Sequence, residues 1–220
     1  MKNKIFLWSM RVIFLLSLFS VVFCIYQIYY SNSQVDVTLA KWEGKKATRV
    51  DESPISGMQF DEQEGESTPI KITAEKVESK KTLYLTSPAK GEVFGKITIP
   101  KIKKEFPIIE GTDLEELAKG VGHFIGSVLP GEADNTVLAG HRDTVFRELG
   151  SVGIGDLVEV ETEAGSFTYK ITKQRIVQQD DRTVIVPYNH AVLTLITCYP
   201  FDAIGPSTDR FILIGELVEK

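Results

Sequence analysis

Cys198 is the residue whose type and position most favour chemistry. It ends the apolar segment Val192–Thr197, which consists of leucine and β-branched residues and is typical of a strand buried on both faces. A loop rich in proline, glycine and aspartate follows, and Arg210 opens the next apolar segment. If the two segments pair as a hairpin, the cysteine and the arginine become neighbours. A cation beside a thiol favours the nucleophilic thiolate.

His141 is the second candidate for a chemical role. It directly follows the apolar run Thr136–Gly140, so it also stands at the end of a predicted strand. A cysteine nucleophile needs a neighbour that keeps it ionised or protonates a departing amine, and imidazole suits both tasks near neutral pH. We therefore interpret Cys198, His141 and Arg210 as the three parts of an acyl-transfer site.

Composition and charge narrow the class of protein. The chain has 220 residues and a net charge of −5, and the three basic residues among the first 30 leave the remainder more acidic still. This balance gives no reason to expect nucleic acid as a partner. There are two cysteines, and Cys24 lies in the apolar N-terminal stretch. Cys198 therefore has no disulfide partner in the predicted folded part.

The N-terminal segment has the pattern of a membrane anchor. Val12–Tyr30 carries no charge and would form a helix of about 28 Å, close to the thickness of a bilayer core. Basic residues precede it and tyrosines cluster at its far end, which predicts a single-pass protein with a cytoplasmic N-terminus and its bulk outside the cell. A cleavable signal peptide is the alternative, but the apolar run is longer than is usual for one.

The rest of the chain divides at about residue 82. Residues 31–82 mix charged residues with Ser, Thr, Gly and Pro and show no sustained period, which predicts an extended extracellular tether. We therefore predict three parts: a cytoplasmic tip and transmembrane anchor at 1–30, the tether at 31–82, and a folded domain at 83–220.

Short apolar runs between turn signals predict a mostly β barrel or sandwich from residue 83 onward. Two short helices are expected to interrupt it. The first is Thr112–Gly120, with Thr112 as N-cap and Glu115 completing a capping box, and the second is Asp143–Gly150. The predicted strands are Val93–Ile99, Phe106–Glu110, His123–Val128, Thr136–Gly140, Leu157–Glu161, Ser166–Gln178, Val192–Cys198 and Phe211–Val218.

The segments around the candidate residues resemble the signature of sortases, the cysteine transpeptidases of Gram-positive cell surfaces. LAGHRDTVF contains His141, TLITC ends at Cys198, and Arg210 follows the cysteine by 12 positions. The resemblance covers Pro88 to Lys220 and implies a closed eight-stranded β-barrel. It also implies that Cys198 is the nucleophile, that His141 is the general acid and base, and that Arg210 holds the substrate and helps to stabilise the oxyanion.

The same resemblance implies the reaction and its partners. The thiolate would attack the Thr–Gly or Thr–Ala bond of an LPxTG- or LPxTA-like signal in a surface-protein precursor. An amine of lipid II or of a peptidoglycan stem peptide would then resolve the acyl-enzyme. Thr197 matches the family threonine that assists the cysteine, and sortases bind their signal beside the loop that contains Ile185, Val186 and Pro187. No cofactor is implied, and a calcium requirement is left open.

Within the family, the motifs look most like class D, whose signals often end in Ala. Family resemblance then suggests diaminopimelate as the acceptor amine. The lid segment and C-terminal membrane helix of pilus-polymerising sortases do not occur in the sequence. The 57 positions between His141 and Cys198 leave little room for the large insertion of class B.

Other interpretations compete with these. A cysteine endopeptidase would pass the same acyl-enzyme to water, whereas a membrane-tethered scaffold would not need Cys198 at all. An L,D-transpeptidase fits poorly because it would place the histidine and cysteine in one short motif. A zinc site built from the cysteine and the three histidines is chemically permissible, but the spacings match no compact zinc motif. We expect His123 to pack near the active site and shape it, and His190 to lie in a solvated loop.

Overall fold

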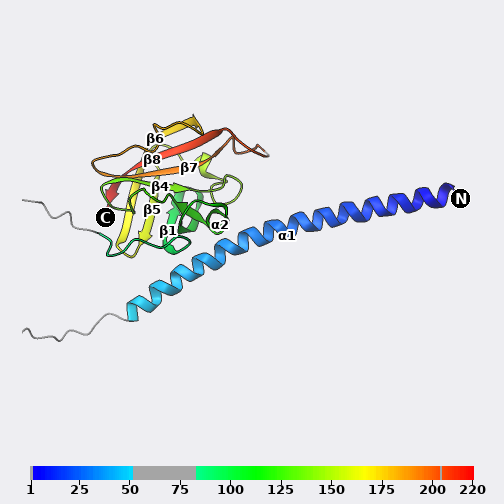
Figure 1. Cartoon of the computed structure of the whole chain (residues 1–220), viewed down its shortest axis with the longest axis horizontal. Coiled ribbons are helices and arrows are strands. Elements are labelled where there is room, and N and C mark those ends of the chain that lie inside the picture. Colours follow the sequence, from blue (N-terminus) through cyan, green and yellow to red (C-terminus); the bar gives the residue numbers. More distant parts are fainter. Residues whose placement is uncertain (1, 52–82, 204) are drawn as a thin grey trace, which may run out of the picture.

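The computed structural model describes residues 2–51, 83–203 and 205–220 and consists of a closed β-barrel beside one long helix (Figure 1). The described residues form eight strands that close in the order β1-β2-β3-β4-β7-β8-β6-β5, which confirms the predicted eight-stranded barrel. The strands are β1 Val93–Ile99, β2 Lys104–Glu110, β3 Val121–His123, β4 Asp134–Ala139, β5 Leu157–Thr162, β6 Gly165–Gln178, β7 Ala191–Tyr199 and β8 Asp209–Glu219. The helices are α1 Lys2–Asp51 and α2 Leu114–Leu117, with 3-10 turns η1 Pro100–Ile102 and η2 Leu149–Ser151.

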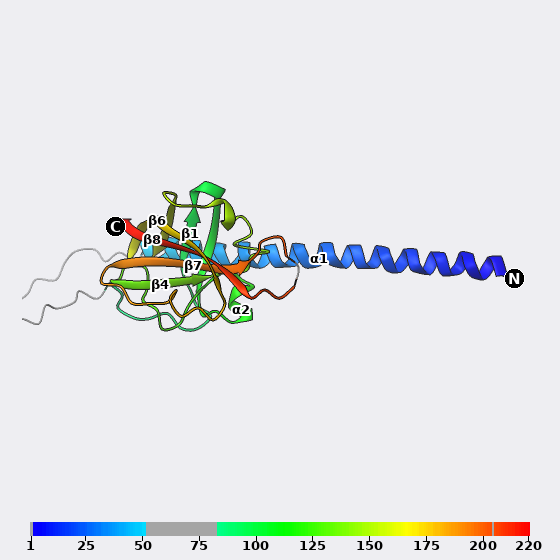
Figure 2. The same ribbon diagram turned by 90° about the horizontal axis from the view of Figure 1, so that it is seen from above.

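Parallel pairing of β4 with β7 determines which residues meet. Ala139 at the end of β4 lies opposite Ile196 in β7, and the chain between these strands builds β5 and β6. β7 in turn pairs antiparallel with β8. The ends of β4 and β7 and the start of β8 therefore lie together at one end of the barrel, and Figure 2 shows the three strands side by side.

Alternation along β7 gives the strand two buried faces. Leu193 and Leu195 point into the main core, whereas Val192 and Ile196 pack on the outside of the barrel. The outer cluster is covered by the loop between β6 and β7, where Val184 is buried. This explains the uninterrupted apolar run of β7, because neither face of the strand is left to water.

Three predicted local elements differ in the structure. β3 ends at His123, where the predicted strand begins. α2 is only four residues long, and its N-cap is Asp113 without a side-chain capping bond, so the capping box is wrong. The segment predicted as the helix Asp143–Gly150 forms turns and part of η2. Val145 and Phe146 in this segment are buried close to Gly140, so core packing shapes the segment.

The extended conformation predicted for residues 31–82 is wrong for residues 31–51, which continue α1. Tertiary contacts explain the difference. Trp42 is buried against Val93 and Ile109 of the barrel, and Lys45 lies 2.8 Å from Glu92. Residues 52–82 of the predicted tether lie outside the described residues.

The first half of α1 extends away from the barrel (Figure 1). The large apolar side chains described there between Trp8 and Tyr26 are exposed. In the part of the chain that the structure describes, no helix is long and apolar enough to cross a membrane, so the transmembrane anchor predicted at residues 12–30 is not supported.

Candidate active site

Cys198 and Arg210 lie directly opposite each other on β7 and β8. Residues opposite each other in an antiparallel pair point to the same face, with Cβ atoms about 5 Å apart. Cys198 follows Ile196 by two positions, so it points to the outer face of the barrel, and it is half-buried. The hairpin predicted from the sequence therefore brings the thiol and the cation together.

Arg210 is held by backbone and amide groups and not by a carboxylate. Its Nη1 donates to the carbonyl oxygens of Ser207 and Asp209 at 2.9 and 3.0 Å, and its Nη2 donates to Gln179 Oε1 at 3.3 Å. Within residues 2–51, 83–203 and 205–220, no ion pair engages this guanidinium. Its positive charge therefore remains available to an anion beside Cys198.

His141 stands level with Cys198 at the end of the neighbouring strand. The backbone N–H of Gly140 donates to the Ile196 carbonyl at 3.1 Å, which continues the β4–β7 ladder one residue beyond Ala139. Extended by one more residue, this register sets the backbone of His141 level with Cys198. Its imidazole is half-buried and has no hydrogen-bond partner in the described chain. No described residue therefore occupies its ring nitrogens.

Thr197 points to the opposite face from Cys198. Its side chain is 2% exposed, and its hydroxyl donates to the Gly140 carbonyl at 2.8 Å. The structure therefore assigns Thr197 to fixing the end of β4 just before His141, and does not place it where a substrate would bind.

Arg142 is a residue of the site that the sequence interpretation missed. It is 8% exposed, and it donates to the carbonyl oxygens of Pro200 and Gly205 in the loop between Cys198 and Arg210. The sequence does not show whether an arginine is buried or exposed. The position of Arg142 directly after His141 is therefore the only feature that could have indicated a role in the site.

Comparison with known proteins agrees with this geometry. Residues 97–218 match the family model of the sortase domain. The chain is 45% identical over 132 residues to sortase D of Bacillus subtilis (strain 168). The aligned region covers 60% of this chain and 67% of that protein. It is 26% identical over 133 residues to sortase A of Bacillus anthracis, spanning 59% and 61% respectively. A solved Clostridium perfringens sortase D5 transpeptidase gives a TM-score of 0.54 at 28% identity, over 60% of this chain and 83% of that one.

This chain belongs to the sortase family. Members of the family are cysteine transpeptidases, and the similarity to sortase D makes the chain a class D homologue. The match to the family model includes His141, Cys198 and Arg210.

The loop between β6 and β7 of this sortase covers the same outer face as Cys198. Asn135 at the start of β4 donates through Nδ2 to the carbonyl oxygens of Val184 and Val186 at 3.4 and 3.3 Å, and it accepts a bond from the Thr194 hydroxyl. The preceding Asp134 accepts a bond from the Tyr188 backbone N–H at 2.7 Å.

These bonds fasten Val184, Val186 and Tyr188 and leave the residues between them facing solvent. Ile185 is 46% exposed, Pro187 is exposed, and Val186 is half-buried. The structure thus presents two of the three predicted groove residues as apolar side chains open to a ligand. The anchoring residues Asp134 and Asn135 were not identified from the sequence.

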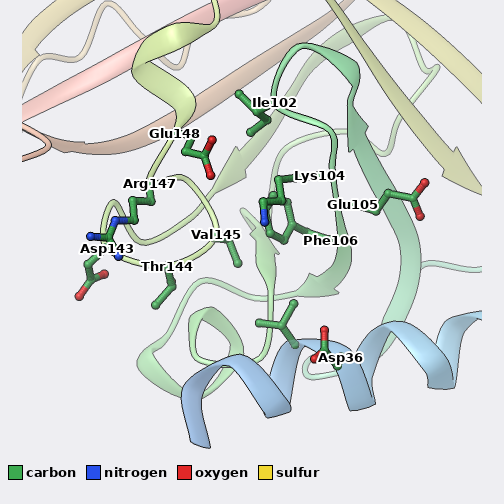
Figure 3. A pocket seen from close by; sticks show the side chains of 11 residues that line it. Asp36, Ile102, Lys104, Glu105, Phe106, Asp143, Thr144, Val145, Arg147 and Glu148 are labelled. Atoms are coloured by element: carbon green, nitrogen blue, oxygen red, sulfur yellow. The ribbon is translucent and has the colours of Figure 1, made fainter. Parts of the chain in front are cut away.

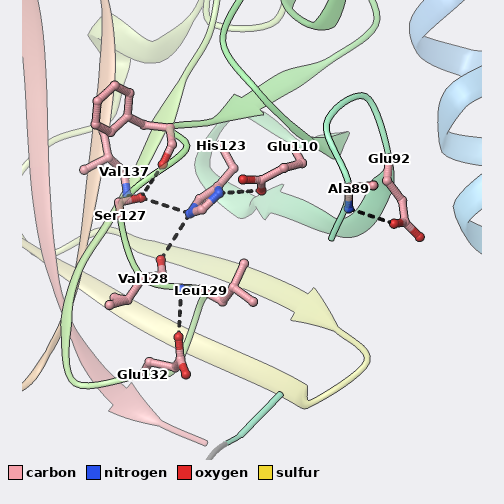
Figure 4. A network of polar contacts seen from close by, with 10 residues as sticks. Ala89, Glu92, Glu110, His123, Ser127, Val128, Leu129, Glu132 and Val137 are labelled. Carbon is pink, nitrogen blue, oxygen red and sulfur yellow. Dashed lines mark hydrogen bonds and ion pairs between the residues drawn. The ribbon is translucent and has the colours of Figure 1, made fainter. Parts of the chain in front are cut away.

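His123 is not part of the sortase active site. It is 1% exposed inside the barrel, where its ring meets Phe94 edge to face. Its Nδ1 lies 2.6 Å from Glu110 Oε2, and its Nε2 lies 3.1 Å from the Val128 carbonyl and 2.9 Å from Ser127 Oγ (Figure 4). Both ring nitrogens form their hydrogen bonds inside the barrel. His123 therefore stabilises the barrel interior and does not shape the active site as expected.

His190 lies in the loop before β7, exposed and bonded to the neighbouring Asn189, as predicted. Among the residues described, no group of three or more His, Cys, Asp or Glu side chains could hold a metal ion.

A cavity of about 440 Å³ lies elsewhere, between α1, β2 and the segment after His141 (Figure 3). Its lining carries both signs of charge, including Asp36, Lys104 and Arg147. None of its lining residues is a predicted site residue.

Proposed function

We propose that this chain is a class D sortase that cleaves an LPxTG- or LPxTA-like signal after Thr and transfers the acyl group to an amine of a peptidoglycan precursor. The reaction would anchor surface proteins to the cell wall. The observation that carries this proposal is the direct pairing of Cys198 with Arg210 beside His141, in a chain of the sortase family.

The three residues suit the two half-reactions. The Cys198 thiol gives its proton to His141 as its sulfur attacks the threonine carbonyl carbon, and the guanidinium of Arg210 stabilises the negative charge that develops on the carbonyl oxygen. His141 gives a proton to the departing glycine or alanine amine as the C–N bond breaks, leaving a thioester.

The second half-reaction reverses these roles. An acceptor amine attacks the thioester and passes its proton to His141, which gives it to the sulfur as the C–S bond breaks, so the Cys198 thiol is regenerated. Lipid II or a stem peptide would supply the amine, with diaminopimelate as the candidate residue.

The signal would bind along the outer face between β4, β7 and the loop that precedes β7. The exposed apolar side chains of Ile185 and Pro187 support this position for the Leu-Pro part of the signal, since apolar groups gain free energy by leaving water together.

The test is the intact mass of the full-length chain in mild detergent after incubation with LPxTA and LPxTG peptides, with and without diaminopimelate. We expect a mass increase equal to the acyl fragment, its absence in Cys198→Ala, and its loss when the amine is added, with a peptide–amine product. Preference for the LPxTA peptide would support class D.

Two outcomes would contradict the proposal. An adduct that passes only to water, whether or not the amine is present, would favour the cysteine endopeptidase. No adduct with either peptide, in protein shown by circular dichroism to be folded, would favour a non-enzymatic scaffold.

We further propose that the chain acts at the cell membrane, with the N-terminus in the cytoplasm and the barrel on the extracellular face. The exposed apolar side chains between Trp8 and Tyr26 support a membrane contact, because they would otherwise lie in water. Protease treatment of intact cells should degrade the barrel, and protection of the barrel would contradict this location.

A further inference from the structure

We propose that Arg142 is a positioning residue that holds the β7–β8 loop, and with it Arg210, in the arrangement needed for acyl transfer. The inference rests on the proposed function, because it assigns the loop a part in that reaction. It concerns a residue that contacts neither the sulfur of Cys198 nor the substrate.

The contacts of Arg142 join the two sides of the active site. The loop runs from Pro200, two residues after Cys198, to Thr208, just before β8 begins. Arg142 Nη1 donates to the Pro200 carbonyl at 3.0 Å, and its Nη2 donates to the Gly205 carbonyl at 2.5 Å. One guanidinium therefore bonds both the departing and the returning limb of the loop.

The setting of these bonds makes them strong. Arg142 is 8% exposed, and in the described part of the chain no carboxylate forms an ion pair with it. The two carbonyl oxygens are thus the groups that compensate a nearly buried charge, and hydrogen bonds to charged donors are stronger than neutral ones. Release of the loop would leave this buried cation without hydrogen-bond partners, so the two bonds stabilise the bound position of the loop.

The two residues that flank His141 are fastened to β7 and its loop. Gly140 bonds to Ile196 and Thr197 through its backbone, and Arg142 bonds to the loop through its side chain. His141 lies between these attachments. Because His141 is covalently linked to both attached residues, its distance from the loop is fixed. Arg210 lies just after the loop, so its position relative to His141 is fixed as well.

The fork of the guanidinium is needed, and not only its charge. Two nitrogens of one planar group reach two carbonyls that lie five residues apart in sequence, whereas lysine offers a single nitrogen on a flexible stem. Lysine at position 142 can keep the positive charge but not both bonds.

The loop has a second support, which should let variants of Arg142 fold. Phe201 packs edge to face on Tyr199 and on Phe211, with ring centroids 5.9 and 5.2 Å apart, and it also lies against Gly150. Loss of the arginine bonds should therefore loosen the loop without removing the barrel core.

The experiment compares Arg142→Lys and Arg142→Met with Arg147→Met in the full-length chain in mild detergent. Arg147 is an exposed arginine of the same segment, and it makes no bond to the described residues of the loop, so it is the matched control. Two quantities are measured: hydrogen exchange of the β7–β8 loop amides by mass spectrometry, and kcat and KM for the signal peptide.

We expect both Arg142 variants to exchange the loop amides about tenfold faster than the unmodified chain and to lose about 10- to 100-fold in kcat, with KM changed less than threefold. Arg147→Met should match the unmodified chain in both measurements. Unchanged loop exchange in Arg142→Met would overturn the pinning of the loop. Faster exchange with an unchanged kcat would overturn its part in the reaction.

The lysine variant separates geometry from charge, because a kcat close to that of the unmodified chain in Arg142→Lys would overturn the need for two bonds. Failure of the proposed function would look different: the unmodified chain itself would form no acyl adduct, while the exchange measurement would still report on the loop.

Discussion

Two histidines that look alike in the sequence have opposite settings in the structure. His123 ends β3 and points into the barrel, where both ring nitrogens are bonded. His141 follows β4 by two residues, level with Cys198 in the β4–β7 register, and its half-buried imidazole has no bonded partner among the described residues. A histidine at a strand end becomes a proton carrier only if it lies on the solvent-accessible face and its nitrogens are not already used.

The largest expected effect is a loss of activity on substitution of His141. His141→Gln should lower kcat/KM for the signal peptide by at least about 10³-fold, because no group remains to protonate the leaving amine. The midpoint of thermal unfolding should change little, since His141 makes no side-chain bond in the described chain. Steady-state kinetics on the folded variant is the measurement, and a loss below tenfold would place the proton carrier elsewhere.

The second prediction concerns the stability that the buried His123 gives to the barrel. His123→Phe should lower the free energy of unfolding by about 3 kcal/mol, because it leaves the Glu110 carboxyl buried without its partner. The double variant His123→Phe with Glu110→Leu should regain part of this loss. Urea unfolding gives the free energies, and kcat per folded molecule should stay within threefold of the unmodified chain.

A double variant as unstable as the sum of the two single variants would contradict the coupling between His123 and Glu110. Loss of activity in folded His123→Phe would return this histidine to the active site.

The third prediction concerns the loop that covers the outer face. Asn135→Ala removes the donor that fastens the carbonyls of Val184 and Val186, so Ile185 and Pro187 should lose their fixed positions. KM for the signal peptide should rise about five- to tenfold with little change in kcat, because the groove is remote from the reacting atoms. Asn189→Ala, in the exposed part of the same loop, is the control and should leave KM unchanged.

The smallest expected effect is a pH dependence of the stability, which comes from the buried Tyr169. Burial raises the pKa of Tyr169 to about 12, and its hydroxyl accepts a bond from the Gly131 backbone N–H at 2.8 Å. Since the pKa in the unfolded chain is about 10, the contribution of Tyr169 to stability is complete below pH 10 and is lost as pH rises to about 12. Tyrosinate absorbance of the native chain should show this late titration, and Tyr169→Phe should remove it. An identical titration curve in the variant would refute the assignment.

The strands and the Cys198–Arg210 pair could be predicted because they depend on local patterns. Apolar runs between turn residues predicted the positions of the strands, and the β7–β8 register confirms that the cysteine and arginine are neighbours. The setting of His123 could not be predicted, because it depends on where β3 ends. The predicted strand began at His123, whereas the real one stops there.

Long-range contacts explain the other differences. Residues 31–51 lack a helical pattern of their own, and α1 continues there because Trp42 is buried against Val93 and Ile109. The burial of Arg142 likewise depends on carbonyl oxygens 58 and 63 positions further along the chain. Such partners are chosen by the completed barrel and leave no periodic signal in the sequence.

The parallel pairing of β4 with β7 determines when the active site is assembled during folding. His141 and Cys198 are brought together only after β5 and β6 have been made and β7 has closed a long loop, and Arg210 arrives later still with β8. Contacts between such distant segments form late and slowly in folding. A ribosome-bound chain that stops before residue 209 would carry a thiol without its cation, so we expect incomplete chains to have no acylating activity.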